Sequence, residues 1–193
     1  MTRSRVLRAL LATSLLVAVC AAGGAWWFYD AFLRDLPDLR RIEDYAPKRT
    51  SVVLDREGRT IGEFAEERRR LVPIEDIPRH VQLAFVSAED GSFFEHEGLD
   101  YRGILRAALA NLRAGGAKSQ GASTITQQMV KSLLLTPEKT YRRKIREMIL
   151  ARDIEKRFTK QEILYLYLNQ IYFGQGAWGV EEAARTYFGK SVS

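Results

Sequence analysis

One long apolar stretch lies near the start of the chain. No charged side chain occurs from Ala9 to Tyr29, and a helix of this length, at about 1.5 Å per residue, spans the roughly 30 Å of a hydrocarbon core. Arginines precede the stretch, and an aromatic belt of two tryptophans and a tyrosine closes it, so the positive-inside rule predicts that the rest of the chain lies outside the cytoplasm. We predict a cytoplasmic tail (1–8) and a transmembrane helix (9–29). A signal peptide cleaved near Ala21 is the alternative.

The next stretch alternates first in charge and then in hydrophobicity. Residues 30–50 mix acids and bases around two prolines, which predicts a juxtamembrane connector. Residues 51–54 and 59–64 are separated by Asp-Arg-Glu-Gly, and they predict a small β-hairpin. The charges at 66–70 predict a solvated turn, and contact with lipid phosphates is the alternative.

Beyond the hairpin, apolar residues recur at the spacing of amphipathic helices. A helix that opens at Pro78 and ends at Glu89 is predicted to bury Val81, Ala84, Phe85 and Ala88. A second helix, with Asp100 as its N-cap, is predicted to bury Ile104, Leu105, Ala108, Leu109 and Leu112. Small and polar residues fill 115–123, which predicts a mobile loop that acts as a lid or substrate clamp.

Ser and Thr residues mark the starts of the later helices. A Ser-Thr pair at 123–124 is predicted to cap one helix, and Thr136, which precedes a proline, to cap a long helix that reaches about Phe158. Thr159 is predicted to cap the next helix, and residues 180–189 are predicted to start a last helix and end in a Tyr-Phe-Gly turn. The predicted fold class is mainly α with one small hairpin. The chain stops without a closing element, so we expect a domain truncated at its C-terminus.

The composition is that of a folded and mildly basic chain. Hydrophobic residues make up 46% and charged residues 28% of the 193 residues, which excludes a disordered chain. Half of the net charge of +6 comes from three arginines before the apolar stretch, so the remainder is only weakly basic. The sequence contains no zinc spacing, Walker-type phosphate loop, nucleophile elbow or nucleic-acid motif. We therefore expect no nucleic-acid partner.

Five acids crowd the junction between the first two predicted helices beyond the hairpin: Glu89, Asp90, Glu95, Glu97 and Asp100. They are interleaved with two phenylalanines and a leucine, so some of them must lie beside apolar surface. There the charged form of a carboxylate is disfavoured, and the group can act as a base near neutral pH. The alternative is an acidic surface loop.

Another acid lies among apolar residues on a predicted helix. Glu147 is followed at i+4, i+7 and i+11 by Ala151, Ile154 and Phe158. This position is unusual for a structural glutamate. An i, i+4 ion pair with Arg143 is the competing interpretation, and the pattern favours neither.

Four sequence blocks follow one another behind the apolar stretch. They are Glu89-Asp90-x-x-Phe93-x-x-His96-x-Gly98-x-Asp100, Gly121-x-Ser123-Thr124-Ile125-Thr126-Gln127-Gln128, Arg143-Lys144-x-x-Glu147 and Lys160-x-x-Ile163-Leu164-x-x-Tyr167-Leu168-Asn169. Each block alone is weak, but in this order they closely resemble the peptidoglycan glycosyltransferases, the transglycosylase domains of class A penicillin-binding proteins and their monofunctional relatives. The resemblance extends from about Ser51 to the end of the chain.

This resemblance implies a lysozyme-like helical domain over residues 51–193, resting on the outer face of the bacterial cytoplasmic membrane. It implies two substrates, lipid II and a growing glycan chain on undecaprenyl diphosphate, which are joined by a β-1,4 bond with inversion. Cell-wall synthesis or division proteins are the further partners that it implies. Whether a transpeptidase domain follows Ser193 stays open.

The resemblance also implies roles for single residues. Glu89 is similar to the general base that takes the proton of the acceptor's 4-hydroxyl, and Glu147 to a second carboxylate in the donor site. A departing diphosphate needs cations and hydrogen-bond donors, and the candidates are Lys131, Lys139, Arg143, Lys144, Ser123, Thr124, Gln127 and Gln128. Further substrate-binding candidates in the blocks are Asp90, Phe93, His96 and Asn169. In this family Mg²⁺ or Mn²⁺ can assist, with Asp90 and Glu89 nearby.

Two other functions compete with this one. A lysozyme-like hydrolase or lytic transglycosylase would also place one catalytic glutamate at a helix end, but it would need no cations for a diphosphate. A non-catalytic, membrane-anchored scaffold that binds peptidoglycan precursors would need no base at Glu89.

Overall fold

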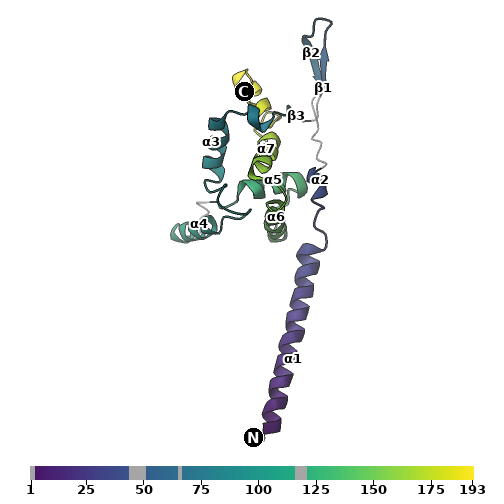
Figure 1. Cartoon of the computed structure of the whole chain (residues 1–193), viewed down its shortest axis with the longest axis vertical. Coiled ribbons are helices and arrows are strands. Elements are labelled where there is room, and N and C mark those ends of the chain that lie inside the picture. The colour runs from purple at the N-terminus through teal and green to yellow at the C-terminus, as the bar shows by residue number, and fades with distance from the viewer. Residues whose placement is uncertain (1–2, 44–50, 65–66, 116–120) are drawn as a thin grey trace.

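The chain folds into a helical body from which one long helix projects (Figure 1). The computed structural model describes residues 3–43, 51–64, 67–115 and 121–193. The mainly helical fold class is confirmed, and the strands among the described residues form two sheets of two strands each. Most of the loop predicted at 115–123 lies outside the described residues.

The projecting helix is the predicted membrane span. Helix α1 (Arg3–Phe28) continues as a π-helical segment, η1 (Tyr29–Leu33). Residues Leu10–Leu33 are long and apolar enough to cross a membrane, and the most apolar part of this stretch has no residue buried within the protein. Leu15, for example, is 67% exposed, which is unlike a buried core helix. The apolar helix is therefore confirmed, and its helical run extends beyond the predicted end at Tyr29.

The body consists mainly of helices, and all of them except one at its edge contribute residues to one apolar core. They are α2 (Arg40–Glu43), α3 (Arg79–Glu89), α4 (Tyr101–Arg113), α5 (Ile125–Leu134), α6 (Tyr141–Ile154), α7 (Lys160–Gln170) and α8 (Val180–Phe188), with a 3-10 turn, η2, at Ile74–Asp76. Helix α5 packs against both α6 and α7. Ile125 and Met129 of α5 are fully buried, and Leu150 of α6 and Leu164 of α7 are at most 1% exposed. The position of α5 therefore determines where its neighbours lie.

The segment after the membrane helix packs against the body. Arg142 of α6 donates a 2.7 Å hydrogen bond from Nε to the carbonyl oxygen of Ala31. Leu39 and Ile42 are buried in the apolar core. The predicted connector is thus a packed element as far as α2, and its remaining residues, 44–50, lie outside the described residues.

The predicted hairpin is confirmed. Strand β1 (Ser51–Leu54) pairs antiparallel with β2 (Thr60–Phe64), and the register shifts after Val53. The hairpin stands apart from the helices (Figure 1), and Ile61 and Phe64 are 67% and 71% exposed. Its formation therefore depends on the local turn and strand pairing more than on the core.

The charged segment predicted as a solvated turn is buried at one position, and its first residue, 66, lies outside the described residues. Strand β3 (Arg68–Arg69) pairs in parallel with β4 (Ala177–Trp178). The Arg69 side chain is 2% exposed, donates a 2.7 Å hydrogen bond to Oε1 of Gln170 and lies over the Trp178 ring. The prediction is wrong at Arg69 because distant residues supply the polar and aromatic partners that a buried guanidinium needs.

Helix α6 begins later than its sequence signal predicts. The prediction placed its first turn at Pro137, whereas the helix begins at Tyr141. Thr140 is the N-cap, because its Oγ1 accepts a 3.1 Å hydrogen bond from the backbone N–H of Arg143. A later threonine therefore replaces Thr136 as the cap.

The predicted buried face of α3 is confirmed only in part, because Val81 and Phe85 are partly buried against the core. Gln82 and Val86 are its buried residues, whereas Ala84 and Ala88 are exposed. The amide of Gln82 donates hydrogen bonds of 3.0 Å and 2.8 Å to the carbonyls of Ile74 and Ile77. A polar side chain therefore joins the buried face, where the turn before α3 accepts the hydrogen bonds of its amide nitrogen.

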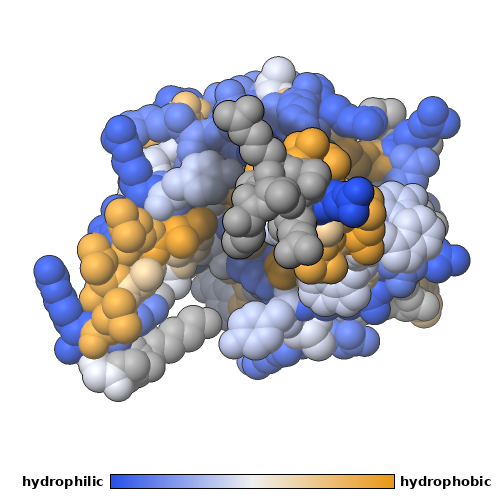
Figure 2. Space-filling model, turned by 90° about the horizontal axis from the view of Figure 1, so that it is seen from below, coloured by the Kyte–Doolittle hydropathy of each residue, from blue (hydrophilic) through white to orange (hydrophobic). Residues whose placement is uncertain are grey.

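Helix α4 exposes the apolar face that was predicted to be buried. Leu105, Leu109 and Leu112 are 62%, 47% and 74% exposed, whereas Gly103 and Ala107 are buried. Helix α4 lies at the edge of the body (Figure 1), and Figure 2 shows an apolar surface at this edge, on the left of the view. The prediction is wrong because the periodicity of a helix does not say whether another element covers its apolar face.

Candidate active site

Asp90 fastens the loop after α3 to the start of α5. Its side chain is 3% exposed, and Oδ2 accepts a 3.0 Å hydrogen bond from the backbone N–H of Ile125. Both carboxylate oxygens also lie 3.0 Å from Nε2 of His96. Asp90 and His96 therefore face each other inside the protein.

Phe93, in the same loop, is fully buried. The Lys160 ammonium lies 4.5 Å from the centroid of its ring, donates a 2.6 Å hydrogen bond to the carbonyl of His96 and pairs with Glu155 at 2.7 Å. Lys160 was not among the predicted site residues, although it opens the fourth block. Its contacts indicate that the block holds the acidic loop in place.

Gly98 lets this loop approach α6 closely. Its φ is +84°, and a Cβ at this position would lie 2.7 Å from the carbonyl oxygen of Ala151. Thr124 donates a 2.7 Å hydrogen bond from Oγ1 to the carbonyl of Gly98. A side chain at position 98 would therefore push the loop away from both α5 and α6.

Glu89 occupies the last position of α3, and its side chain is exposed. Its Oε2 accepts a 2.8 Å hydrogen bond from Nε2 of Gln128 on α5. Glu89 lines a cavity of about 410 Å³ to which Ser92, Asp100 and Ser123 also contribute. The hydrogen bond fixes the direction of the carboxylate, and the cavity gives a hydroxyl group access to it.

Two neighbours of Glu89 have shifted pKa values. The backbone N–H of Gly103, 2.8 Å from Asp100, lowers the pKa of that carboxyl group, and the Ser92 hydroxyl acts in the same direction. Burial raises the pKa of the Tyr167 phenol, and the charge of Glu89 raises it further. At neutral pH, Asp100 is therefore the ionised N-cap of α4, and Tyr167 keeps its proton.

Thr124 and Gln127 form a capping box at the start of α5. Thr124 Oγ1 accepts a 3.2 Å hydrogen bond from the backbone N–H of Gln127, and Gln127 Oε1 accepts a 3.0 Å bond from the backbone N–H of Thr124. Both residues are at most 2% exposed. They shape the helix start, whereas Ser123 and Gln128 are the members of this block that line a cavity with Glu147.

Glu147 is buried on α6 between two cations. It is 2% exposed, accepts a 2.6 Å hydrogen bond from Nη1 of Arg143 and pairs through its other oxygen with Lys144. Lys144 also donates a 2.9 Å hydrogen bond to the Ser123 hydroxyl. Both interpretations of the sequence therefore hold, because Glu147 shares the buried face with Ala151 and is paired as well.

The four predicted cations come together around this carboxylate. A cavity of about 560 Å³ is lined by Lys131, Lys139, Arg143, Lys144, Glu147, Ser123 and Gln128. Thr140 and Tyr141, which were not among the predicted site residues, complete its wall. Within the part of the chain that the structure describes, Nε of Arg143 is buried without a hydrogen-bond partner. The cavity is therefore suited to an anion with several oxygens.

The two cavities adjoin. Ser123 lines both of them. Gln128 lines the cation cavity and donates its hydrogen bond to Glu89. The structure thus brings Glu89, Glu147 and the predicted cations to one surface, which the two adjoining cavities form.

Asn169 is not part of this surface. Its Nδ2 donates 3.0 Å hydrogen bonds to the carbonyls of Val72 and Tyr165, and its Oδ1 accepts a 3.0 Å bond from the backbone N–H of Val72. It is 4% exposed. Asn169 therefore ties α7 to the chain before η2.

The possible metal ligands were Asp90 and Glu89. No group of three or more His, Cys, Asp or Glu residues that could hold a metal ion occurs in the described ranges. Both oxygens of Asp90 face His96, and one also accepts from Ile125. Asp90 therefore does not fit as a metal ligand, and the roles argued below rest on side chains alone.

The sequence of the chain is similar to those of several known proteins. Residues 57–193 match the family model described as Transglycosylase. Penicillin-binding protein 1A of Rickettsia bellii (strain RML369-C) is 47% identical over 163 residues, which are 83% of this chain and 21% of that protein. Penicillin-binding protein 1A of Aquifex aeolicus (strain VF5) is 50% identical over 82% of the chain and 22% of its own length. The Escherichia coli (strain K12) protein of that name is 44% identical over 92% of this chain and 21% of its own length.

The chain thus spans about a fifth of the length of the curated relatives that it matches. The residues that line the two adjoining cavities all fall within the range matched by the family model. The chain therefore belongs to the transglycosylase family.

Proposed function

We propose that the chain is a membrane-anchored peptidoglycan glycosyltransferase. It joins a growing glycan chain, carried on undecaprenyl diphosphate, to the 4-hydroxyl of lipid II through a β-1,4 bond, and it releases the lipid diphosphate. The observation that carries this proposal is that Glu89 and a cluster of four cations line adjoining cavities that share Ser123.

Glu89 is the general base in this proposal. A sugar hydroxyl is a poor nucleophile until a positioned carboxylate takes its proton in the transition state, a contribution of about 10²–10⁴ in rate. Gln128 holds the carboxylate from one side, and the cavity leaves the other side open to the acceptor. Inversion requires the hydroxyl to attack from the face opposite the leaving group, and two adjoining cavities provide the two faces.

The cation cavity holds the leaving diphosphate. Negative charge develops on its oxygens as the bond to the sugar breaks, and preorganised cations stabilise that charge without reorganisation. Arg143 and Lys144 are fixed by Glu147, while Lys131 and Lys139 lie on the exposed wall. Glu147 already accepts from both cations, so its role in this proposal is to orient them rather than to exchange a proton.

The membrane setting brings the lipid-linked substrates to the site. Helix α1 anchors the chain with its N-terminus in the cytoplasm, as the positive-inside rule predicts, and the catalytic body lies on the outer face. Helix α4 adds an exposed face that combines Leu105, Leu109 and Leu112 with the basic residues Arg106 and Arg113. Such a face suits the boundary between acyl chains and headgroups.

The cation cavity also separates this function from its competitors. A glycan-cleaving enzyme and a precursor-binding scaffold both fit a glutamate at a helix end, but cleavage of glycan forms no diphosphate that four cations would stabilise. A scaffold would bind the diphosphate without needing a proton acceptor beside it.

The test is polymerisation of labelled lipid II by the full chain in detergent micelles. The wild type is expected to form glycan polymer, and Glu89→Gln to lose at least about 100-fold in turnover with unchanged circular dichroism. Glu75→Gln, at an exposed glutamate of η2, is the matched control and is expected to keep full activity. Fragments released from preformed glycan without polymer, or full activity of Glu89→Gln, would overturn the proposal.

A further inference from the structure

Tyr141, the first residue of α6, has a side chain that is 93% exposed. It lines the cation cavity, where all the other described residues of the wall are polar or charged. Single exposed aromatic residues are common at protein surfaces, but this one borders the candidate diphosphate site. The roles argued above for the cations and the two glutamates leave this ring unused.

The start of α6 lies beside the end of the membrane helix. Arg142 donates a 2.7 Å hydrogen bond from Nε to the carbonyl oxygen of Ala31, and Ala31 belongs to the apolar stretch Leu10–Leu33, which is long enough to cross a membrane. Figure 1 shows α6 on the side of the body from which α1 projects. Tyr141 precedes Arg142 directly, so it lies near the expected bilayer surface, where tyrosine is a favoured residue.

Apolar side chains continue from Tyr141 along one face of α6. Ile145 and Met148 follow at i+4 and i+7, so they share the face of Tyr141, and both are half-buried. At about 100° per residue, Ile145 lies between Tyr141 and Arg146 around the helix, and Arg146 approaches the Ala31 carbonyl. An apolar chain that left the cavity past Tyr141 would therefore meet further apolar side chains on its way to η1.

We propose that Tyr141 binds the lipid chain of the donor, next to its diphosphate. This inference rests on the proposed function and names the residue that recognises the lipid of the leaving group. The lipid is joined to the diphosphate by one phosphoester bond. Its first carbons therefore lie in or beside the cavity whose cations hold the diphosphate.

The Tyr141 ring is the apolar surface that the described wall of this cavity offers to the lipid. Contact between the two removes apolar area from water, which is favourable. Acyl chains of bilayer lipids share this chemistry. The cations in the same wall favour the chain that is attached to the diphosphate.

The test measures one coupling step with the full chain in detergent micelles free of phospholipid. The donor has its own 4-hydroxyl blocked, so that it cannot act as acceptor. The acceptor is an analogue of lipid II in which a carbon–phosphorus bond replaces the sugar–phosphate bond, so that it cannot act as donor. Two donors are compared, one with the complete undecaprenyl chain and one whose diphosphate ends in a methyl group.

Tyr141→Ala is expected to raise the KM of the undecaprenyl donor about fivefold, which is equivalent to about 1 kcal/mol. The kcat is expected to change less than about twofold, because the ring contacts no reacting atom. The KM of the methyl donor is expected to stay within about twofold of the wild-type value, since that donor has no chain for the ring to contact. Tyr141→Phe keeps the ring and is expected to retain both wild-type KM values.

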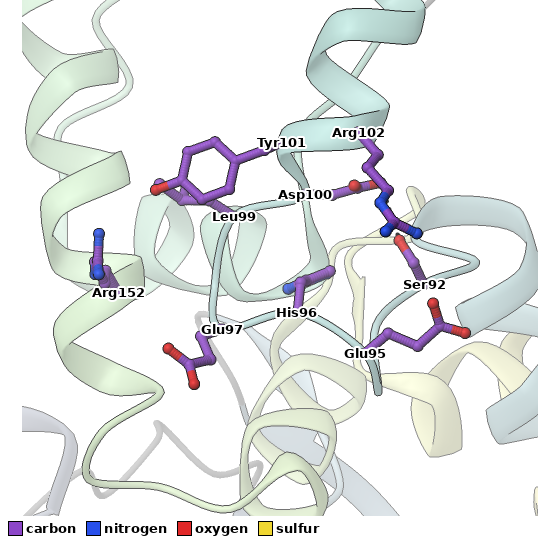
Figure 3. Close-up of a pocket in the computed structure, with 9 residues that line it drawn as sticks. All are labelled: Ser92, Glu95, His96, Glu97, Leu99, Asp100, Tyr101, Arg102 and Arg152. Atoms are coloured by element: carbon purple, nitrogen blue, oxygen red, sulfur yellow. Dashed lines mark hydrogen bonds between the residues drawn. The ribbon is translucent and has the colours of Figure 1, made fainter.

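Tyr101→Ala is the matched control. Tyr101 is the first residue of α4 and is 62% exposed. It lines a different cavity, of about 480 Å³, whose wall also includes Arg102 and Arg152 (Figure 3). Tyr101→Ala is expected to leave both KM values unchanged, and circular dichroism checks that each variant keeps its fold.

The outcomes separate this inference from the function on which it rests. A wild-type KM of Tyr141→Ala for the undecaprenyl donor overturns the lipid contact, and so does an equal rise for both donors, which would assign the ring to the diphosphate or the sugar. A loss in Tyr141→Phe as large as that in Tyr141→Ala assigns the effect to the hydroxyl and also overturns it.

The same measurements in phosphatidylcholine vesicles distinguish the two sources of lipid. An effect of Tyr141→Ala that appears only in the vesicles assigns the ring to bilayer acyl chains and overturns the inference. In each of these cases the wild type still couples the donor, and the glycosyltransferase stands. A wild type that couples neither donor contradicts the proposed function itself.

Discussion

Gln128 of α5 donates a 2.8 Å hydrogen bond to Glu89, the last residue of α3. The bond joins two helices that are far apart in the sequence. Because Gln128 also lines the cation cavity, one side chain connects the candidate base to the candidate diphosphate site.

Gln128→Leu is expected to lower kcat about tenfold, because the carboxylate loses the amide that directs it, and one such hydrogen bond is worth roughly 1–2 kcal/mol. Single-turnover rates with lipid II measure this effect. Gln161→Leu, at an exposed position of α7, is the control. An unchanged kcat would show that Glu89 is held by other contacts.

Glu147→Gln is expected to lower both stability and activity, because Arg143 and Lys144 lose the carboxylate between them. Removing one member of a fully buried pair costs about 3–5 kcal/mol. The Lys144 side chain is 38% exposed, so we expect about 2 kcal/mol in the free energy of unfolding. Chemical denaturation measures it, with Glu138→Gln as the exposed control. A loss no larger than that of the control, with polymerisation unaltered, would rule out the orienting role.

Tyr167→Phe is expected to leave the free energy of unfolding unchanged or to raise it by up to about 1 kcal/mol. The Tyr167 hydroxyl is buried without a hydrogen-bond partner in the described part of the chain, so its removal relieves a desolvated group. Thermal melts of the two proteins measure the difference. A loss above about 1 kcal/mol would mean that the hydroxyl has a partner such as an ordered water.

Asp100 is expected to contribute stability that depends on pH. The Gly103 N–H lowers its pKa in the folded chain. Its contribution is therefore complete above the unfolded value of about 3.9 and is lost as the pH falls through the lower folded pKa.

Asp100→Asn keeps an N-cap but does not titrate, whereas Asp100→Ala removes the cap at a cost of about 1 kcal/mol. Unfolding curves between pH 7 and pH 3 should therefore show the advantage of wild type over Asp100→Asn shrinking below about pH 4. A constant difference across this range would contradict the assigned hydrogen bond.

Local signals in the sequence predicted the elements that depend on few residues. The Thr159 cap is confirmed, because Thr159 and Glu162 form a capping box within three positions of one another. The spacing placed Glu147 among apolar residues but did not decide between that position and an ion pair with Arg143, and the structure shows both. By contrast, Thr136 and Thr140 compete for the start of α6, and only the folded chain shows which one caps it.

The direction in which a single side chain points, toward the cavities or into the core, could not be predicted from the sequence. Membership of a block does not separate a residue that meets the substrate from one that holds the loop, and Phe93 and Asn169 are buried by contacts with distant segments. The role of Lys160 could not be predicted for the same reason, because its partners lie in the acidic loop and at the end of α6. The catalytic and substrate-binding roles themselves stay predictions.

The docking of η1 on α6 has a mechanical consequence. Arg142 and Arg146 hold the Ala31 carbonyl and approach Asp35 from the helix that also carries Glu147. A bilayer whose hydrocarbon thickness differs from the length of α1 would tilt that helix. Because η1 is hydrogen-bonded to α6, a tilt of α1 would shift α6 and with it the side chains of Arg143 and Lys144. The thickness of the surrounding bilayer would thereby change how strongly these cations bind the leaving diphosphate.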